Sequence, residues 1–123
     1  MKRYTFKKEE RLCSKRSIDD LFANGSSFVL YPFRIVYLRR SPIGHPVEML
    51  VSVPKRRFPR AVDRNLIKRR IRECYRLNKE EYVYSHVQNE QEQLLLAIQY
   101  VAKEVLDYAT ICSQLQKALA KLK

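Results

Sequence analysis

Basic side chains recur at helical spacing in the stretch AVDRNLIKRRIRECYR, which spans residues 61–76. Four of them follow one another at intervals of four residues and so share one side of a helix: Arg64, Lys68, Arg72 and Arg76. We expect no carboxylate to be interleaved with them, so their charges repel, and the phosphates of a polyanion would relieve that repulsion. The stretch is therefore suited to phosphate binding, and a helix must present it.

The same helix has an apolar side. A helical wheel places Asn65 and Arg69 beside the four basic residues. The opposite side carries apolar residues that can pack on a sheet: Leu66, Ile67, Ile71, Cys74 and Leu77. Arg70 falls within this apolar arc, so its side chain must extend past the edge of the packing or reach a separate partner.

Positive charge also accumulates just before the helix. The segment PKRRFPR adds four basic residues to the helix N-terminus, where backbone N–H groups can bind phosphate: Lys55, Arg56, Arg57 and Arg60. Residues 55–79 hold eleven basic and two acidic residues, a net of +9 out of the +12 of the whole chain. Such a local surplus indicates a polyanionic partner, with nucleic acid first and an anionic membrane surface second.

No residues are grouped as hydrolytic chemistry requires. Two-metal nucleases hold their ions about 4 Å apart with clustered carboxylates. Here Asp19-Asp20 and Glu80-Glu81 are adjacent pairs typical of caps and surfaces, and the other acidic residues near the basic helix are isolated. We therefore predict no catalytic residue and no metal site in this chain.

The cysteines are odd in number and far apart. Cys13, Cys74 and Cys112 fit neither a disulfide framework nor the short pairs of a zinc site, so we interpret them as reduced thiols. Only His45 and His86 could serve a cysteine nucleophile as base, which argues against that chemistry. No apolar run approaches the ~20 residues that span a bilayer, and MKRYTFKKEE lacks the apolar centre of a signal peptide. We expect a cytoplasmic protein.

The length of 123 residues predicts a single domain, 1–123, that binds RNA. Hydrophobic periodicity predicts a helix in 14–25, strands in 26–40 and 47–53, the basic helix, a strand in the apolar run LLLAIQYVA, and a last helix over 107–121 capped by Asp107. The first three strands are expected to form an antiparallel meander. The order α-β-β-β-α-β-α predicts an α+β two-layer sandwich with one mainly antiparallel sheet.

The stretch RAVDRNLIKRRIRE, preceded by VSVPKR, resembles the signature of the bacterial ribonuclease P protein family. The positions that match the family's basic pattern are Arg64, Asn65, Lys68, Arg69 and Arg72. RLCSKRSIDDLFANGSSF resembles the family's opening helix and the glycine after it. The resemblance implies the same element order, with a left-handed crossover through the basic helix.

In that family the protein binds the catalytic RNA of ribonuclease P and the 5′ leader of precursor tRNA, while the RNA and its Mg²⁺ ions cleave the leader. The resemblance thus implies these two RNA partners, no cofactor bound by the protein alone, and no role for membrane or DNA. The residues expected to contact the catalytic RNA are Lys55, Arg56, Arg57, Arg60, Arg64, Asn65, Lys68, Arg69, Arg72 and Arg76.

For the leader, the family uses a cleft between the first helix and the sheet. Apolar side chains on which bases stack and a basic group for phosphate could come from Ile18, Phe22, Arg34, Val36 and Tyr37. The alternative is that Ile18 and Phe22 only belong to the core stripe of an amphipathic helix.

The family has an Arg-Asn-Arg core in its basic helix, and this chain departs from it at the third position, which is Leu66. The RNA contact of that third residue is either absent here or moved to Arg70. Ile18 stands where an aromatic residue is common, so stacking there should be weaker. An alternative function is a ribosomal-type or RNA-chaperone protein with no enzymatic role. A DNA-binding regulator ranks last, because basic residues all along a half-packed helix suit phosphate contact better than base readout.

Overall fold

Helices and strands alternate along the chain as the sequence predicts. A computed structural model describes residues 12, 15–40, 47–82 and 93–121, with the side chains of 79–82 outside the description. Its elements are α1 (Lys15–Asn24), β1 (Ser26–Leu30), β2 (Phe33–Arg40), β3 (Val47–Ser52), α2 (Ala61–Tyr82), β4 (Gln93–Tyr100) and α3 (Tyr108–Ala120). The N-cap is also confirmed, because the Asp107 carboxylate accepts a hydrogen bond from the backbone N–H of Thr110, at 2.8 Å.

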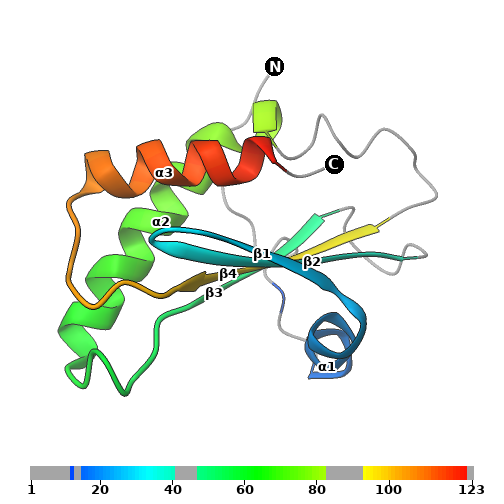
Figure 1. Cartoon of the computed structure of the whole chain (residues 1–123), viewed down its shortest axis with the longest axis horizontal. Helices are drawn as coiled ribbons and strands as arrows, with labels where there is room; N and C mark the ends of the chain where they lie inside the picture. Colours follow the sequence, from blue (N-terminus) through cyan, green and yellow to red (C-terminus); the bar gives the residue numbers. More distant parts are fainter. Residues whose placement is uncertain (1–11, 13–14, 41–46, 83–92, 122–123) are drawn as a thin grey trace.

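The four strands form one sheet in the order β1-β2-β4-β3 (Figure 1). β2 is antiparallel to both β1 and β4, whereas β3 runs parallel to β4 and is joined to it through α2. The expected meander of the first three strands is therefore wrong, because β4 lies between β2 and β3. Seven of the eight β4 residues are buried, and a strand so apolar belongs in the centre of a sheet with both faces covered. The crossover is confirmed, and its left-handed sense stays a prediction.

Helices cover both faces of this sheet, with α2 and α3 on one side and α1 on the other (Figure 1). Along β4, Leu94, Leu96 and Ile98 join the larger apolar cluster with α2 and α3. Their neighbours Leu95 and Ala97 join the smaller cluster with Leu21 of α1. The predicted α+β sandwich is confirmed, and α1 adds a partial layer on its second face.

The buried side of α2 is rotated from the one that the wheel predicts. Ile67, Ile71 and Cys74 are buried as expected, but the fourth buried residue is Tyr75, while Leu77 is 42% exposed and Leu66 is half-buried. The prediction that Leu66 and Leu77 lie on the packed side is therefore wrong. Tyr75 follows Arg64 by eleven residues, which is a rotation of only about 20° on a helix. Burying Tyr75 thus brings Arg64 to the edge of the core.

A disulfide joins α2 to α3 between Cys74 and Cys112, whose Cα atoms are 5.4 Å apart. The interpretation of these two cysteines as reduced thiols is therefore wrong. The helices lie side by side and run in the same direction, so residues far apart in sequence meet, and Gln116 Nε2 donates to Asn78 Oδ1 at 3.1 Å one turn further on. The remaining cysteine, Cys13, and the two histidines lie outside the described residues, as do the side chains of Glu80 and Glu81.

The bridge predicts a dependence of stability on redox conditions. Reducing it should lower the free energy of unfolding by about 4 kcal/mol, because it closes a loop of 38 residues that the reduced, unfolded chain leaves open. Urea denaturation with and without a thiol reductant measures the difference. The Cys112→Ala variant is the control and should respond to reductant little or not at all. Equal stability of the native chain under both conditions would contradict the bridge.

Candidate nucleic-acid interface

The outward side of α2 gathers part of the predicted basic set. Asn65, Arg69 and Arg72 are exposed, and Lys68 is half-buried beside them. Arg60 is exposed immediately before the first turn of the helix. These residues lie on the side of α2 that faces away from the sheet, since Ile67, Ile71 and Cys74 fill the opposite side. The structure thus brings them together on a surface that can follow a phosphate backbone.

Arg76 shares its charge with a carboxylate. Its Nη2 lies 2.5 Å from Glu73 Oε1, and its Nε donates to Glu73 Oε2 at 3.2 Å. This hydrogen bond lowers the pKa of the Glu73 carboxyl and raises the pKa of the Arg76 guanidinium. The expectation that no carboxylate is interleaved with the basic stripe is therefore wrong at this end. The Glu73 carboxylate thus offsets part of the positive charge at Arg76.

Arg64 belongs partly to the scaffold. Its guanidinium is half-buried, and Nη1 donates to the carbonyl oxygens of Phe58 and Pro59, both at 2.8 Å. Phe58 is 5% exposed and packs on the ring of Tyr100, with the ring centroids 5.8 Å apart. Arg64 therefore holds residues 53–60, which we call the basic loop, at the start of α2.

Arg70 has a partner inside the chain. Its Nη1 donates to the carbonyl oxygen of Leu106 at 2.5 Å, in the loop between β4 and α3. The Tyr100 hydroxyl joins the same loop, since it donates to Glu104 O at 2.7 Å and accepts from Leu106 N at 3.1 Å. Burial raises the pKa of this hydroxyl, so it stays protonated and able to donate. Of the two alternatives for Arg70, the structure supports a separate partner, which is the loop before α3.

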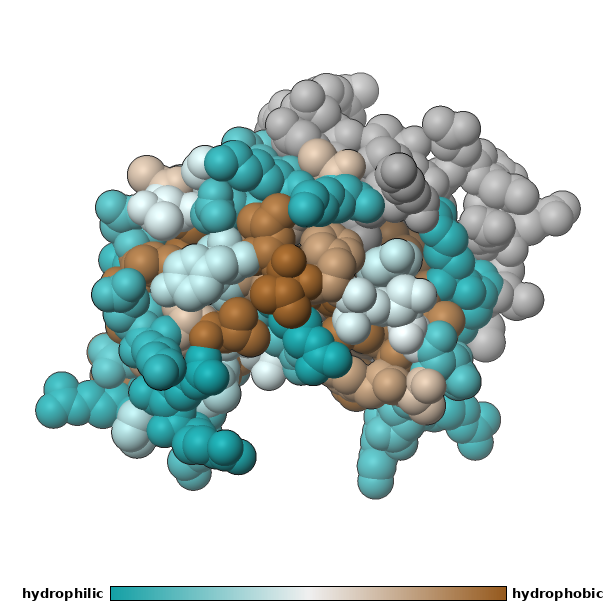
Figure 2. Space-filling view, in the orientation of Figure 1, coloured by the Kyte–Doolittle hydropathy of each residue, from teal (hydrophilic) through white to brown (hydrophobic). Residues whose placement is uncertain are grey.

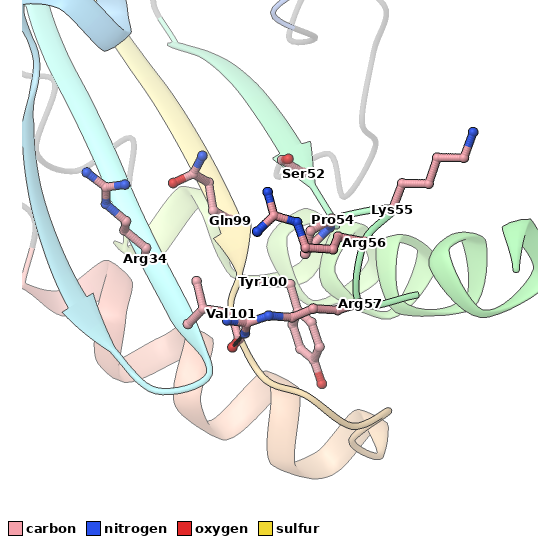
Figure 3. Close-up of a pocket in the computed structure, with 9 residues that line it drawn as sticks. All are labelled: Arg34, Ser52, Pro54, Lys55, Arg56, Arg57, Gln99, Tyr100 and Val101. Carbon is pink, nitrogen blue, oxygen red and sulfur yellow. Dashed lines mark hydrogen bonds between the residues drawn. The ribbon is translucent and has the colours of Figure 1, made fainter. Parts of the chain in front are cut away.

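A basic pocket of about 470 Å³ lies where β3 and β4 end and the basic loop begins (Figure 3). Arg34, Gln99 and Ser52 occupy matching register positions on β2, β4 and β3, and so form a row across the sheet. The pocket is lined by Arg34, Ser52, Pro54, Lys55, Arg56, Arg57, Gln99, Tyr100 and Val101. In Figure 3 the Arg56 side chain extends toward Gln99 and Ser52, whereas Lys55 points away from them. Arg57 donates from Nη1 to Val101 O and so ties the basic loop to the end of β4.

The row continues onto β1 at Val29, which pairs with Arg34 and is 67% exposed. By alternation along each strand, these four positions share the face that carries α1, beyond the part that α1 covers. We call the row Val29, Arg34, Gln99 and Ser52 the groove floor. Figure 2 shows the corresponding hollow between the projections made by α1 and by the basic loop. Sequence analysis missed three of these residues because strand register was unknown, although the polar Gln99 within LLLAIQYVA was a signal.

The five residues predicted for the leader cleft do not all meet. Phe22 is 45% exposed on α1, and Arg34 is exposed on the groove floor. Ile18 is half-buried and packs on the smaller apolar cluster, and Val36 is 4% exposed beneath α1. Tyr37 points to the other face, where its ring contacts Phe28 with the centroids 6.1 Å apart, so its assignment to this cleft is wrong. Of the five, only Phe22 and Arg34 have exposed side chains, and Arg34 also lines the pocket.

Within the described ranges, no group of three or more His, Cys, Asp or Glu is placed to hold a metal ion. In the same part of the chain no helix is long and apolar enough to cross a membrane. The pocket lining carries four basic side chains and no acidic one. Its chemistry is therefore that of an anion-binding surface with hydrogen-bonding groups at its centre.

The chain matches the family model described as Ribonuclease P over residues 6–123. It is 42% identical to the ribonuclease P protein component of Porphyromonas gingivalis, over 94% of this chain and 84% of the relative. It is 34% identical to that of Petrotoga mobilis, over 99% of this chain and 98% of the relative.

Two solved structures share the fold. The RNase P protein of Staphylococcus aureus superposes with a TM-score of 0.69 at 23% identity, over 91% of this chain and 94% of that one. The RNase P protein of Thermotoga maritima gives a TM-score of 0.68 at 21% identity, over 93% and 98%. Because so few residues are identical, the likeness to these two structures concerns the fold.

Two adjacent arginines of α2 provide a matched test, because Arg70 bonds to a loop of the protein and Arg69 lies on the outward side of the helix. Arg70→Ala should lower the free energy of unfolding by about 1–3 kcal/mol, because a charged hydrogen bond to Leu106 O is lost. Arg69→Ala, on the outward side of α2, should leave unfolding unchanged and reduce the salt dependence of RNA binding by about one counterion. Urea denaturation and RNA titrations at several salt concentrations measure both effects. The reverse pattern would show that the two roles are exchanged.

Proposed function

This chain belongs to the bacterial ribonuclease P protein family, and from that premise we propose that it binds two RNAs through two surfaces. The outward side of α2 and the basic loop would bind the catalytic RNA of ribonuclease P. The groove between α1 and the basic loop would bind the single-stranded 5′ leader of precursor tRNA. The observation that carries this assignment is the groove floor, a row across the sheet that is exposed at Val29 and Arg34, half-buried at Gln99 and Ser52, and ends at a cluster of basic side chains.

The surface for the catalytic RNA is supported by charge and by shape. Arg60, Asn65, Arg69 and Arg72 are exposed on or just before one helix, and the helix is held rigid by packing along its opposite side. Arg and Lys on such a surface bind phosphates without reading sequence, which suits a folded RNA better than the edges of DNA bases. Arg57, Arg64 and Arg76 contribute their charge, although each also has a contact within the protein.

The groove suits a single strand. Phe22 offers an exposed ring at the α1 wall, and base stacking on one aromatic ring contributes about 1–3 kcal/mol. Arg34 and Arg56 offer charge for the backbone from the floor and from the opposite wall. Gln99 and Ser52 lie between them with groups that can donate or accept hydrogen bonds. An unstacked nucleotide needs this combination of an aromatic face, cations and polar groups.

We propose that hydrolysis belongs to the RNA and its Mg²⁺ ions, and that the protein supplies binding and orientation. Phosphodiester cleavage by two metal ions needs several carboxylates or phosphates around the ions. The RNA has phosphates for this purpose, whereas the described residues of the protein have no cluster of three metal-ligating side chains. We place the enzyme in the cytoplasm, in keeping with the targeting prediction made from the sequence.

Reconstitution tests the proposed function directly. The protein should restore cleavage of precursor tRNA by a bacterial ribonuclease P RNA at low Mg²⁺, because its cations replace metal ions that screen RNA phosphates. The measurement is 5′ leader release with and without protein over a Mg²⁺ series, and a basic protein of unrelated fold is the control. Failure to stimulate cleavage, together with co-purification on ribosomal particles, would favour a ribosomal-type function instead.

Phe22→Ala tests the leader groove. In the reconstituted enzyme it should weaken binding of leader-bearing precursor tRNA about fivefold or more, by the loss of one stacking contact, and leave binding of mature tRNA unchanged. The matched control is Tyr108→Ala, which removes an exposed aromatic ring from α3 on the other side of the sheet and should change neither affinity. An equal loss for both tRNA forms would show that Phe22 acts on folding or on the catalytic RNA.

A further inference from the structure

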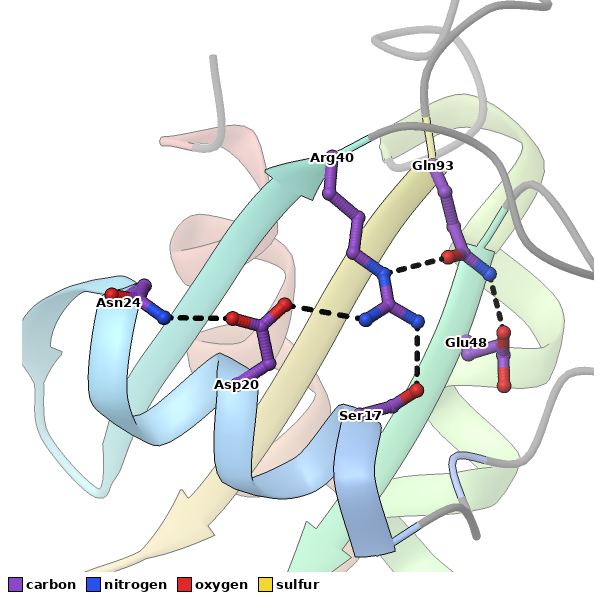
Figure 4. A network of polar contacts seen from close by, with 6 residues as sticks. All are labelled: Ser17, Asp20, Asn24, Arg40, Glu48 and Gln93. Atoms are coloured by element: carbon purple, nitrogen blue, oxygen red, sulfur yellow. Dashed lines mark hydrogen bonds and ion pairs between the residues drawn. The ribbon is translucent and has the colours of Figure 1, made fainter.

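One guanidinium connects α1 to three strands of the sheet (Figure 4). Arg40, the last residue of β2, donates from Nη2 to Ser17 Oγ at 2.7 Å and pairs through Nη1 with Asp20 Oδ2 at 3.2 Å. Its Nε donates to Gln93 Oε1 at 3.1 Å, and Gln93 in turn donates from Nε2 to Glu48 on β3. We call these five residues the Arg40 network.

The centre of the network is shielded from water, whereas the Asp20 side chain at its edge is 36% exposed. The Arg40 side chain is 17% exposed, Ser17 is 7% exposed and Gln93 is fully buried. Partly buried hydrogen bonds to a charged group are stronger than exposed ones, and removing one partner leaves the others without compensation. Arg40 is therefore more than a surface ion pair.

Among the described residues, the apolar contacts of α1 come from few side chains. Its apolar seat consists of Leu21, which is buried, and Ile18, which is half-buried on the smaller cluster. At its C-terminal end, Gly25 approaches the sheet closely, since a Cβ there would lie 2.8 Å from Tyr37 O. This close approach fixes where the helix ends. Before the helix begins, Leu12 is buried in the same cluster and its N–H donates to Met49 O of β3 at 2.9 Å. Both contacts lie outside α1, one on each side of it.

Arg40 adds polar contacts on the helix itself. Ser17 and Asp20 are three residues apart, so they lie on one side of α1, and two bonds from one rigid guanidinium fix both the distance and the rotation of the helix. Phe22 is about 100° around the helix from the buried Leu21. A rotation of α1 would therefore swing the Phe22 ring toward or away from the groove floor.

We propose that Arg40 is a positioning residue for leader binding: its network holds α1 so that Phe22 forms one wall of the groove. The inference rests on the proposed function, because it concerns the groove assigned there to the leader. Arg40 touches no RNA in this proposal. It acts through α1, and its effect is confined to substrates that carry a leader.

The primary test uses Arg40→Met, which keeps the length of the side chain and removes its charge and hydrogen bonds. In the reconstituted enzyme, the preference for precursor over mature tRNA should fall about fivefold, as when one stacking contact is lost. Affinity for the ribonuclease P RNA should stay unchanged. Amide hydrogen exchange should accelerate in 15–24 and remain as in the native chain in α2, which a general loss of stability would not produce.

Arg39→Met is the matched control, because position 39 pairs with Leu94 and belongs to the other face of the same strand. It should leave the leader preference unchanged. Arg40→Lys should be intermediate, since an ammonium cannot bridge Ser17 and Asp20 as a planar fork does. Asp20→Asn should reduce the preference on its own and have little further effect in the Arg40→Met background, as expected for residues that act through one network.

The outcomes separate this inference from the function on which it rests. A native enzyme without any leader preference overturns the proposed function and the inference with it. A native preference that survives intact in Arg40→Met overturns the inference alone. If Arg40→Met does not fold, Asp20→Asn decides in its place: a reduced preference with unchanged RNA affinity supports the role of Arg40, and an unchanged preference overturns it.

Discussion

The burial of β4 on both faces is the constraint on which the rest of the structure depends. The run Leu94, Leu95, Leu96, Ala97 and Ile98 has no polar side, so it is stable only in the centre of a sheet between two covering layers. Its neighbours β2 and β3 therefore cannot be adjacent to each other, and the chain must cross from β3 to β4 through α2. Near its C-terminal end the strand turns polar at Gln99, and there the cover from α1 stops. The groove is thus the place where the central strand no longer requires burial.

The arginines of this chain divide between those that build the scaffold and those that remain on the surface. Arg57, Arg64 and Arg70 donate to backbone carbonyl groups of loops, and carbonyl acceptors satisfy a guanidinium without cancelling its charge. These contacts order the loops while the positive field of the protein stays intact for a polyanion. Arg40 and Arg76 instead pair with carboxylates, and Arg40 lies at the opposite end of β2 from the basic pocket. Arg57, Arg64 and Arg70 thus order the loops and keep their positive charge.

Sequence alone predicted what is local and missed what depends on pairing between distant segments. Helical periodicity identified α2 and α3 and the Asp107 cap, because each is determined within a few residues. The meander was wrong since strand order is a property of the whole sheet, and Tyr37 was placed on the wrong face because alternation does not say which face is open. The Cys74–Cys112 bridge was missed because only the packing of α2 on α3 brings these residues together. Arg64 matches the basic pattern of the family, yet no pattern could reveal that its guanidinium also holds Phe58 and Pro59.

The two proposed RNA surfaces are mechanically connected by the basic loop. Phe58 anchors the loop in the core, Arg64 attaches it to α2, and Arg57 attaches it to the end of β4. The loop therefore has little freedom to move relative to either the helix or the groove floor. Lys55 and Arg56 extend from this fixed backbone. A strand bound in the groove and an RNA bound on α2 would therefore be held at a constant distance and orientation relative to each other. A protein that orients a substrate for catalysis by another molecule requires a rigid connection between its two binding surfaces. A flexible connection would allow the substrate to bind without being aligned with the catalytic molecule.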